Sequence, residues 1–255
     1  MEFNKITAVY FSPTGATKQI VSAVFSEFDH PKAEIDLTPF ENSNKSYAFS
    51  RNELVIFGVP VYGDRVPSIA EQRMKQIVGD KTCAILLASY GNVHCQHALY
   101  ELQQITKTNG FITVAAISVV SRHNIVQGIG IGRPNQNDWD MLSDFTIQIK
   151  QKLNISGDIE PIAIVGKPNT HPRDRLPIKP HANANCTSCG MCIKHCPVGA
   201  ISNPKKTSHS SCVRCMRCIH FCPKRARTFG KYKEMIIKIF LRVMSRGEKH
   251  PKIVI

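Results

Sequence analysis

The sequence predicts an α/β domain built on a doubly wound parallel sheet, followed by a small α+β domain rich in cysteine. Three observations lead to this prediction. Apolar, β-rich runs alternate with helical patterns over residues 1–153, which is typical of parallel sheets covered on both faces. Eight of the ten cysteines fall within residues 186–222, in one spacing written twice. The charge also changes, from balanced in the first part to strongly basic in the last.

The first predicted strand leads into a loop of hydroxyl and glycine residues. Residues 5–11 are an apolar run, residues 12–17 read Ser-Pro-Thr-Gly-Ala-Thr, and apolar residues then recur at helical spacing from 20 to 28. A strand, such a loop and a helix N-terminus together favour phosphate binding. Neither GxxxxGK[ST] nor GxGxxG is present. The alternative is an ordinary capped helix start.

The remaining predicted elements continue the alternation. Strands are expected at 33–37, 54–59, 82–88 and 111–120, and helices at 95–109 and 138–153. Two polar, glycine-containing loops follow strands, at 60–67 and 89–92. Loops at the carboxyl ends of parallel strands meet at one edge of the sheet. We therefore expect both of them beside the phosphate loop.

The cysteines of the second part follow the bacterial iron–sulfur spacing. Each run reads Cys-x2-Cys-x2-Cys-x3-Cys-Pro, and in that spacing the fourth cysteine binds the other cluster. Structural zinc favours paired CxxC ligands, and disulfides need an oxidising compartment, so both alternatives fit less well. The spacing predicts two [4Fe–4S] clusters with these ligand sets: Cys186, Cys189, Cys192 and Cys222 for one, and Cys212, Cys215, Cys218 and Cys196 for the other.

Both parts of the chain resemble known families. Residues 183–227 resemble the two-cluster bacterial ferredoxins, and residues 1–153 resemble the flavodoxins, through the phosphate loop and the two loops after it. The whole chain is similar to the flavodoxin–ferredoxin fusion proteins of anaerobic bacteria and archaea. The resemblance implies FMN in the first domain. The alternation of strands and helices predicts a flavodoxin-like strand order of 2-1-3-4-5. Prolines at 161, 168, 172, 177 and 180 predict a semi-rigid linker over 154–182, and a helix and tail are expected over 228–255.

The resemblance also implies which residues contact FMN. The phosphate loop is implied to hold the phosphate, the 60–63 loop to line one edge of the flavin with Tyr62 stacked on it, and the 89–92 loop to line the other edge. The implied residues are Ser12, Thr14, Gly15, Ala16, Thr17, Pro60, Val61, Tyr62, Gly63, Ser89, Tyr90, Gly91 and Asn92.

The loop after Asn92 departs from the fusion family. Its members often have Arg, any residue and then an aromatic residue there, whereas this chain has Val93, His94 and Cys95. Cys95 is interpreted as a small apolar residue at a helix start, with a reactive thiol as the alternative. The glycine-rich segment 121–137 is expected to lie near the flavin or against the ferredoxin domain, with a surface excursion as the alternative.

The basic charge is concentrated at the end of the chain. Residues 1–153 hold 14 Lys+Arg and 14 Asp+Glu, whereas residues 183–255 hold 15 and 2. Anionic clusters offset part of this charge. The rest predicts an acidic redox partner protein on the ferredoxin face; no nucleic-acid motif supports binding of DNA or RNA. The resemblance leaves an oligomer open.

The last predicted helix, at 232–244, is basic and amphipathic. We expect its apolar stripe to pack on the first domain, which makes membrane contact the less favoured alternative. The chain opens without the pattern of a signal peptide and contains no apolar run of about 18 residues, so we expect a cytoplasmic location.

These features predict an electron-transfer protein that links the clusters to FMN. The clusters carry single electrons, and FMN takes one or two. No side chain is predicted to act as an acid, base or nucleophile. The alternative is a flavin reductase that uses the clusters to supply FMN for reduction of a small molecule. A redox-sensing nucleic-acid binder is a third, weaker hypothesis.

Overall fold

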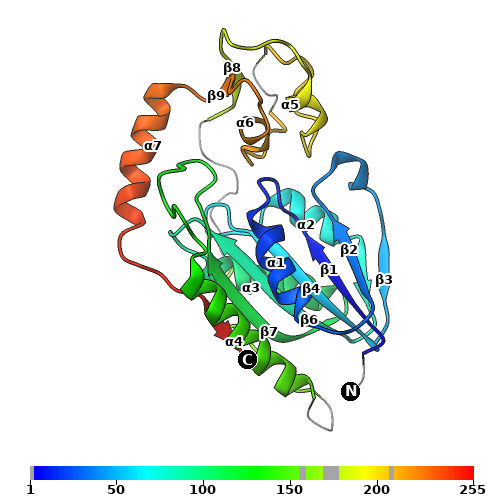
Figure 1. The fold of residues 1–255 in the computed structure, drawn as a ribbon. Helices are drawn as coiled ribbons and strands as arrows, with labels where there is room; N and C mark the ends of the chain where they lie inside the picture. The colour runs from blue at the N-terminus through cyan, green and yellow to red at the C-terminus, as the bar shows by residue number, and fades with distance from the viewer. Residues whose placement is uncertain (1–2, 155–158, 169–177, 207–209) are drawn as a thin grey trace.

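The computed structural model describes residues 3–154, 159–168, 178–206 and 210–255. A central sheet lies in the lower part of the molecule, and the cysteine domain sits above one end of it (Figure 1). A long helix runs down one side and returns the chain to the sheet (Figure 1).

The central sheet has the order β10-β7-β6-β4-β1-β2. Its first five strands along the chain pair in parallel, and β10 joins antiparallel to β7. The strands are β1 (Lys5–Tyr10), β2 (Lys32–Asp36), β4 (Glu53–Pro60), β6 (Thr82–Tyr90), β7 (Phe111–Val120) and β10 (Lys252–Val254). Counting only the five parallel strands, this is the predicted flavodoxin-like order 2-1-3-4-5, which is confirmed.

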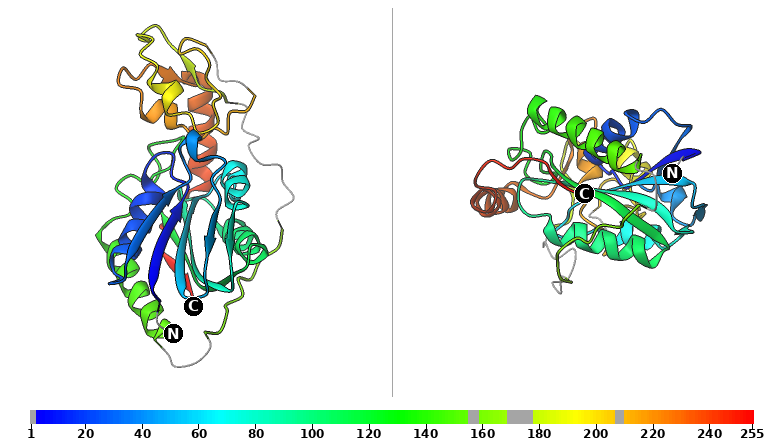
Figure 2. Two further views of the ribbon diagram at one scale, coloured as in Figure 1. Left: turned by 90° about the vertical axis from the view of Figure 1, so that its right-hand side faces the viewer. Right: turned by 90° about the horizontal axis from the view of Figure 1, so that it is seen from below.

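Helices cover both faces of the sheet (Figures 1 and 2). On one face lie α1 (Ala16–Ser26) and α4 (Gln136–Leu153), and on the other α2 (Ser68–Met74) and α3 (Gln96–Thr108). The predicted helices at 95–109 and 138–153 are confirmed, and α4 begins two residues earlier, with Asn135 and Asp138 forming its capping box. The close packing of α1 needs Gly58, since a Cβ there would lie 2.2 Å from Val21 Cγ2.

Besides β10, four elements of this domain lie outside the predicted set. They are the two-stranded sheet of β3 (Tyr47–Phe49) and β5 (Ile77–Gly79), the short helix α2, and the 3-10 helix η1 (Phe40–Asn42). The first three have three to seven residues each, which is too short for periodicity to identify them.

Part of the predicted linker packs on the sheet domain. Ile164 is buried, and its backbone N–H donates to Gln103 Oε1, while Gln103 Nε2 donates to Ile162 O. The prolines at 161, 168 and 180 lie in described segments, whereas Pro172 and Pro177 lie outside the described residues.

The cysteine domain is small and built from short elements. It contains β8 (His181–Ala182) paired antiparallel with β9 (Arg227–Thr228), and the single-turn helices α5 (Met191–Lys194) and α6 (Arg217–His220). The predicted last helix is confirmed as α7 (Lys231–Met244). Its expected packing is wrong, because no residue of α7 is buried and six large apolar side chains are about half exposed or more.

Candidate functional site

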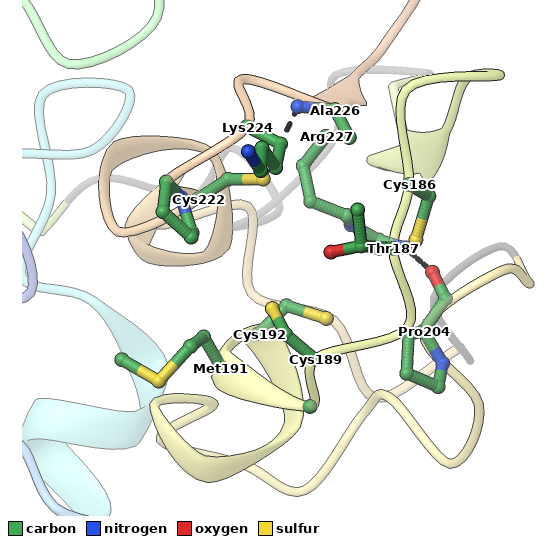
Figure 3. Close-up of a pocket in the computed structure, with 12 residues that line it drawn as sticks. Cys186, Thr187, Cys189, Met191, Cys192, Pro204, Cys222, Lys224, Ala226 and Arg227 are labelled. Carbon is green, nitrogen blue, oxygen red and sulfur yellow. Dashed lines mark hydrogen bonds between the residues drawn. The ribbon is translucent and has the colours of Figure 1, made fainter.

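Four cysteines surround a cavity at the outer end of the cysteine domain (Figure 3). The cavity has a volume of about 320 Å³, including its opening, and its walls include the first predicted ligand set, Cys186, Cys189, Cys192 and Cys222. Cys222 comes from the second cysteine run and the other three from the first. This is the crossed arrangement that the spacing predicts. Cys189 is exposed, so this outer cavity reaches the surface.

The second predicted set surrounds a matching cavity of about 300 Å³. Here the wall includes Cys212, Cys215 and Cys218 from the second run and Cys196 from the first. Cys196, Cys215 and Cys218 are buried, so this inner cavity is the more enclosed of the two. Two cavities that each gather four thiols from both runs fit the two cubane clusters.

The two cysteine runs build the same local structure. Each single-turn helix begins after a residue with positive φ, Gly190 before α5 and Met216 before α6. The fourth cysteine of each run accepts a backbone N–H at its sulfur: Ala200 N lies 3.2 Å from Cys196 Sγ, and Ala226 N lies 3.1 Å from Cys222 Sγ. Hydrogen bonds to sulfur stabilise a thiolate ligand and help to set a cluster's potential.

Arg227 supplies positive charge to both cysteine sets. Burial raises the pKa of Cys218 to about 11 and raises the pKa of Cys192, and the nearby Arg227 opposes both shifts. Arg227 is buried and donates to the carbonyl oxygens of Pro180, Pro204 and Lys206. A guanidinium fixed at this place favours thiolates on both sides.

The phosphate loop joins β1 to the N-terminus of α1 at the carboxyl end of the sheet. Gly15 has φ 92°, which favours glycine, and space around it is open. Ser12 Oγ accepts from Lys18 N, so this hydroxyl binds one of the free N–H groups in the first turn of α1. Thr17 Oγ1 lies 2.6 Å from Ser89 Oγ, which joins this loop to the loop at 89–92, called the third loop below. Val61 N of the 60–67 loop donates to Ser89 O at 2.9 Å, so the three predicted loops meet at one edge.

Side chains of α3 contact the loop at 60–67, called the second loop below. Tyr62 and Arg65 pair through their backbones around Gly63 and Asp64, both with positive φ. His97 Nδ1 lies 2.5 Å from Asp64 Oδ2, and Glu101 accepts from Arg65 Nε at 2.5 Å. These two contacts hold the 60–67 loop against α3.

The third loop differs from its predicted role in one respect. Ser89 and Tyr90 are buried at the end of β6, and Asn92 Nδ2 donates to Ser245 O at 2.8 Å. The C-terminal tail thus holds the amide group that we expected beside the flavin. Within the described residues, Asn92 Oδ1 and Asp64 Oδ1 are buried without a hydrogen-bond partner. Both oxygens lie on the loops predicted to line the flavin, and they fit a ligand with hydrogen-bond donors.

The 121–137 segment lies against the cysteine domain, one of the two places expected for it, and it also packs on the third loop. A Cβ on Gly91 would lie 2.5 Å from the His123 ring, so the segment packs tightly on the third loop. Ile125 packs with Met216 and Phe229 of the cysteine domain. His123 Nδ1 accepts from Ile125 N and Val126 N, and burial lowers the pKa of His123 to about 4. This imidazole is therefore neutral at pH 7.

Two cysteines, Cys83 and Cys95, lie outside the two runs. Burial raises the pKa of Cys95 and of Cys83, which disfavours the reactive thiolate form at both positions. Cys83 is buried in β6. Cys95 is only partly buried, so its interpretation as a small apolar residue stays a prediction.

Two arginines that sequence reasoning missed connect the domains. Arg73 of α2 is buried and donates to Pro197 O, next to Cys196, and also to the carbonyl oxygens of Leu37, Thr38 and Pro39. Arg217 of α6, next to Cys218, donates to Pro13 O at 2.7 Å. In each contact, one of the two bonded residues is next in the chain to a cysteine of the inner set. Only the tertiary structure reveals them, because no motif marks either arginine.

A lysine from the C-terminal tail also reaches the site. Lys249 Nζ donates to Asn92 O at 2.7 Å and to Val93 O at 2.6 Å. The strand β10 that follows fixes the tail on the sheet. A short apolar run at 253–255 was the only signal of this strand.

Comparisons with known proteins match both parts. Two segments match models described as 4Fe-4S binding domain, residues 183–202 and residues 209–230. A Streptococcus pneumoniae flavodoxin structure is 12% identical, covers 58% of this chain and 99% of its own, and has a TM-score of 0.41. The Megasphaera elsdenii flavodoxin is 16% identical, with coverages of 56% and 98% and a TM-score of 0.37.

A flavodoxin from the domain Archaea is 12% identical, with coverages of 59% and 99% and a TM-score of 0.37. Because these TM-scores lie below 0.5, the fold rests on the strand order described above. No curated protein matches the chain. Among the described residues, no helix is both long enough and apolar enough to cross a bilayer.

Proposed function

We propose that this chain, which joins a flavodoxin-like sheet to two 4Fe-4S binding segments, transfers electrons between two [4Fe–4S] clusters and an FMN. When bound, the clusters supply one-electron chemistry and FMN exchanges one or two electrons. The chain's own part is to hold these groups close together and to set the charge around them. The cytoplasm remains the proposed compartment.

The contacts of the inner cysteine set with the sheet domain carry this proposal. Arg217, beside Cys218, reaches Pro13 of the phosphate loop, and Arg73 reaches Pro197, beside Cys196. The inner set therefore faces the predicted FMN site, and the outer set, with the exposed Cys189, lies further along. This order suits a path from a surface partner through the outer and inner sites to the flavin.

The residues proposed to hold FMN lie on the three loops. The phosphate would lie against Ser12 and the N-terminus of α1, whose partial positive charge favours an anion. The ring would lie between the second loop with Tyr62 and the third loop with Gly91 and Asn92. The partner that meets the basic cysteine domain is proposed to be an acidic redox protein.

The reductase alternative receives less support from the described residues. A reductase would need room for a substrate over the flavin, which the open 121–137 loop and the missing aromatic residue after Asn92 would leave. His123 packs on Gly91, and the tail binds Asn92 through Ser245 and Lys249, so other segments occupy part of this space.

Anaerobic purification with analysis of iron, acid-labile sulfide and flavin tests the proposal. We expect about eight irons, eight sulfides and one FMN per chain. Eight irons without FMN, even after reconstitution, would remove the flavin from the proposal. One or two zinc ions in place of iron would overturn the iron–sulfur half.

A further inference from the structure

The helix α7 presents a broad apolar face to solvent. Six large side chains lie on it: Tyr232 is 72% exposed, Met235 52%, Ile236 48%, Ile239 60%, Phe240 60% and Val243 55%. At 3.6 residues per turn these positions share one side of the helix. We call these six residues the outer face. Soluble proteins seldom leave so many adjacent large apolar side chains exposed, and such patches mark interaction sites.

The opposite side of α7 is the one that contacts the rest of the chain. Ile237, Leu241 and Ser245, spaced four apart, are only partly exposed, and Ile237 packs against Ile178, Met216 and Phe229. The helix thus contacts the rest of the chain through only this narrow row of residues. Within the described part of the chain, nothing covers its wider apolar side. Figure 2 shows α7 end-on at the edge of the molecule, where a flat surface has access to it.

Basic side chains border the outer face. Lys231, Lys238 and Arg242 are exposed and follow one edge of it. Residues 231–246 contain five Lys+Arg and one Glu, a net charge of +4. A second copy of this chain would bring two such cationic helices together, which is unfavourable. An apolar face with cationic edges is instead complementary to a surface with negative headgroups over an apolar interior.

We propose that α7 lies flat on an anionic phospholipid surface. The outer face enters the boundary between headgroups and acyl chains, and Lys238 and Arg242 meet the lipid phosphates. At 14 residues, or about 21 Å, the helix is suited to lie in the interface. This surface is separate from the cysteine cavities and the three loops, so the inference goes beyond electron transfer and does not depend on bound cofactors.

Vesicle flotation of the full chain tests the inference. One vesicle population contains phosphatidylglycerol and phosphatidylcholine in equal parts, and the other contains phosphatidylcholine alone. We expect at least about tenfold stronger binding to the anionic vesicles, weakening as salt rises. Equal binding to both populations, or no binding to either, would overturn the proposal.

Matched variants locate the contact. Ile239→Gln with Val243→Gln is expected to reduce vesicle binding at least about tenfold. Ile131→Gln with Ile147→Gln, at positions that are 69% and 50% exposed elsewhere, is expected to leave it unchanged. Because all four positions are exposed, the variants should fold, which thermal melting of each verifies. Unchanged binding by the α7 pair would refute the assignment.

A charge pair supplies an independent check. Lys238→Gln with Arg242→Gln is expected to weaken binding to anionic vesicles by about thirtyfold, whereas the exposed pair Lys45→Gln with Lys107→Gln should have little effect. Sedimentation equilibrium tests the alternative that a second copy of the chain covers the outer face. A wild-type dimer that ignores vesicles and dissociates in the Ile239 and Val243 variant would show that a second copy covers the outer face.

Discussion

Arg217 donates from Nη1 to the carbonyl oxygen of Pro13 at 2.7 Å, joining residues 204 positions apart. Its guanidinium carbon also lies 4.7 Å from the centre of the Phe221 ring. One side chain therefore links the segment between Cys218 and Cys222 to the predicted phosphate loop. Together with the bond from Arg73 to Pro197 O, this contact holds the inner cysteine set beside the proposed flavin site.

Replacing Arg217 is expected to slow electron transfer between the clusters and the flavin. Arg217→Met removes the bond to Pro13, and a shift of about 1 Å between reacting groups can cost tenfold or more in rate. Stopped-flow absorbance after rapid reduction of the clusters measures the step. Lys205→Met, an exposed cation in the same domain, is the control. Equal rates in both variants would show that Arg217 does not position the domains.

The crossed cysteine sets predict which double variants lose one cluster and which lose both. Cys186→Ser with Cys222→Ser removes two ligands from the outer set alone, so we expect about four irons to remain. Cys186→Ser with Cys196→Ser removes one ligand from each set and is expected to lower the iron content further. Iron and sulfide analysis of anaerobically prepared protein measures both. The reverse order would mean that each run binds its own cluster.

Lys249 is expected to support FMN binding through the third loop. Burial lowers the pKa of this ammonium, and it donates to two backbone carbonyls of the loop. Lys249→Met leaves both carbonyls without this donor, and hydrogen bonds to charged groups contribute about 1.5–3 kcal/mol each. We expect the Kd for FMN to rise about tenfold, measured by quenching of flavin fluorescence.

The control for this prediction comes from the same tail. Lys252 is an exposed residue of β10, and Lys252→Met should leave the Kd unchanged. Thermal melting of the flavin-free protein provides a second readout, because a loosened tail should lower the Tm of Lys249→Met alone. An unchanged Kd and Tm for Lys249→Met would contradict the proposed support.

His123 is expected to make stability depend on pH below about 6.5. Its pKa is about 4 in the folded chain, against 6.5 ordinarily, because burial disfavours its charged form. Between these values the unfolded chain binds a proton that the folded chain does not, so stability falls as pH drops from 6.5 to 4. The loss should reach about 1–3 kcal/mol. Urea denaturation at pH 7.0 and 4.5 measures it.

His123→Asn should reduce this pH dependence, because an amide oxygen accepts the same backbone N–H groups without titrating. His94→Asn, at an exposed position, serves as the matched control and should retain the wild-type slope. If His123→Asn and His94→Asn show the same slope, other groups are responsible for the acid sensitivity.

Much of the fold was predictable because its signals are local. Apolar runs such as 54–59 and 111–120 identified buried parallel strands, and α1 and α3 followed helical spacing. Short pieces such as β3 and α2 were missed, since three to seven residues contain too little periodicity. The strand β10 was missed because it pairs with β7, which lies more than a hundred residues earlier in the chain.

The sequence by itself determined the cysteine spacing, the three loops at strand ends and the basic charge of the last third, since each of these depends on neighbouring residues. Only the tertiary structure decided which distant groups meet. Lys249 and Asn92 are 157 positions apart, and the sequence does not indicate that they bond. The tertiary structure also decided that α7 packs through Ile237 and exposes its wider apolar side to solvent. An amphipathic pattern predicts that a helix has an apolar side, but the surrounding packing decides what that side contacts.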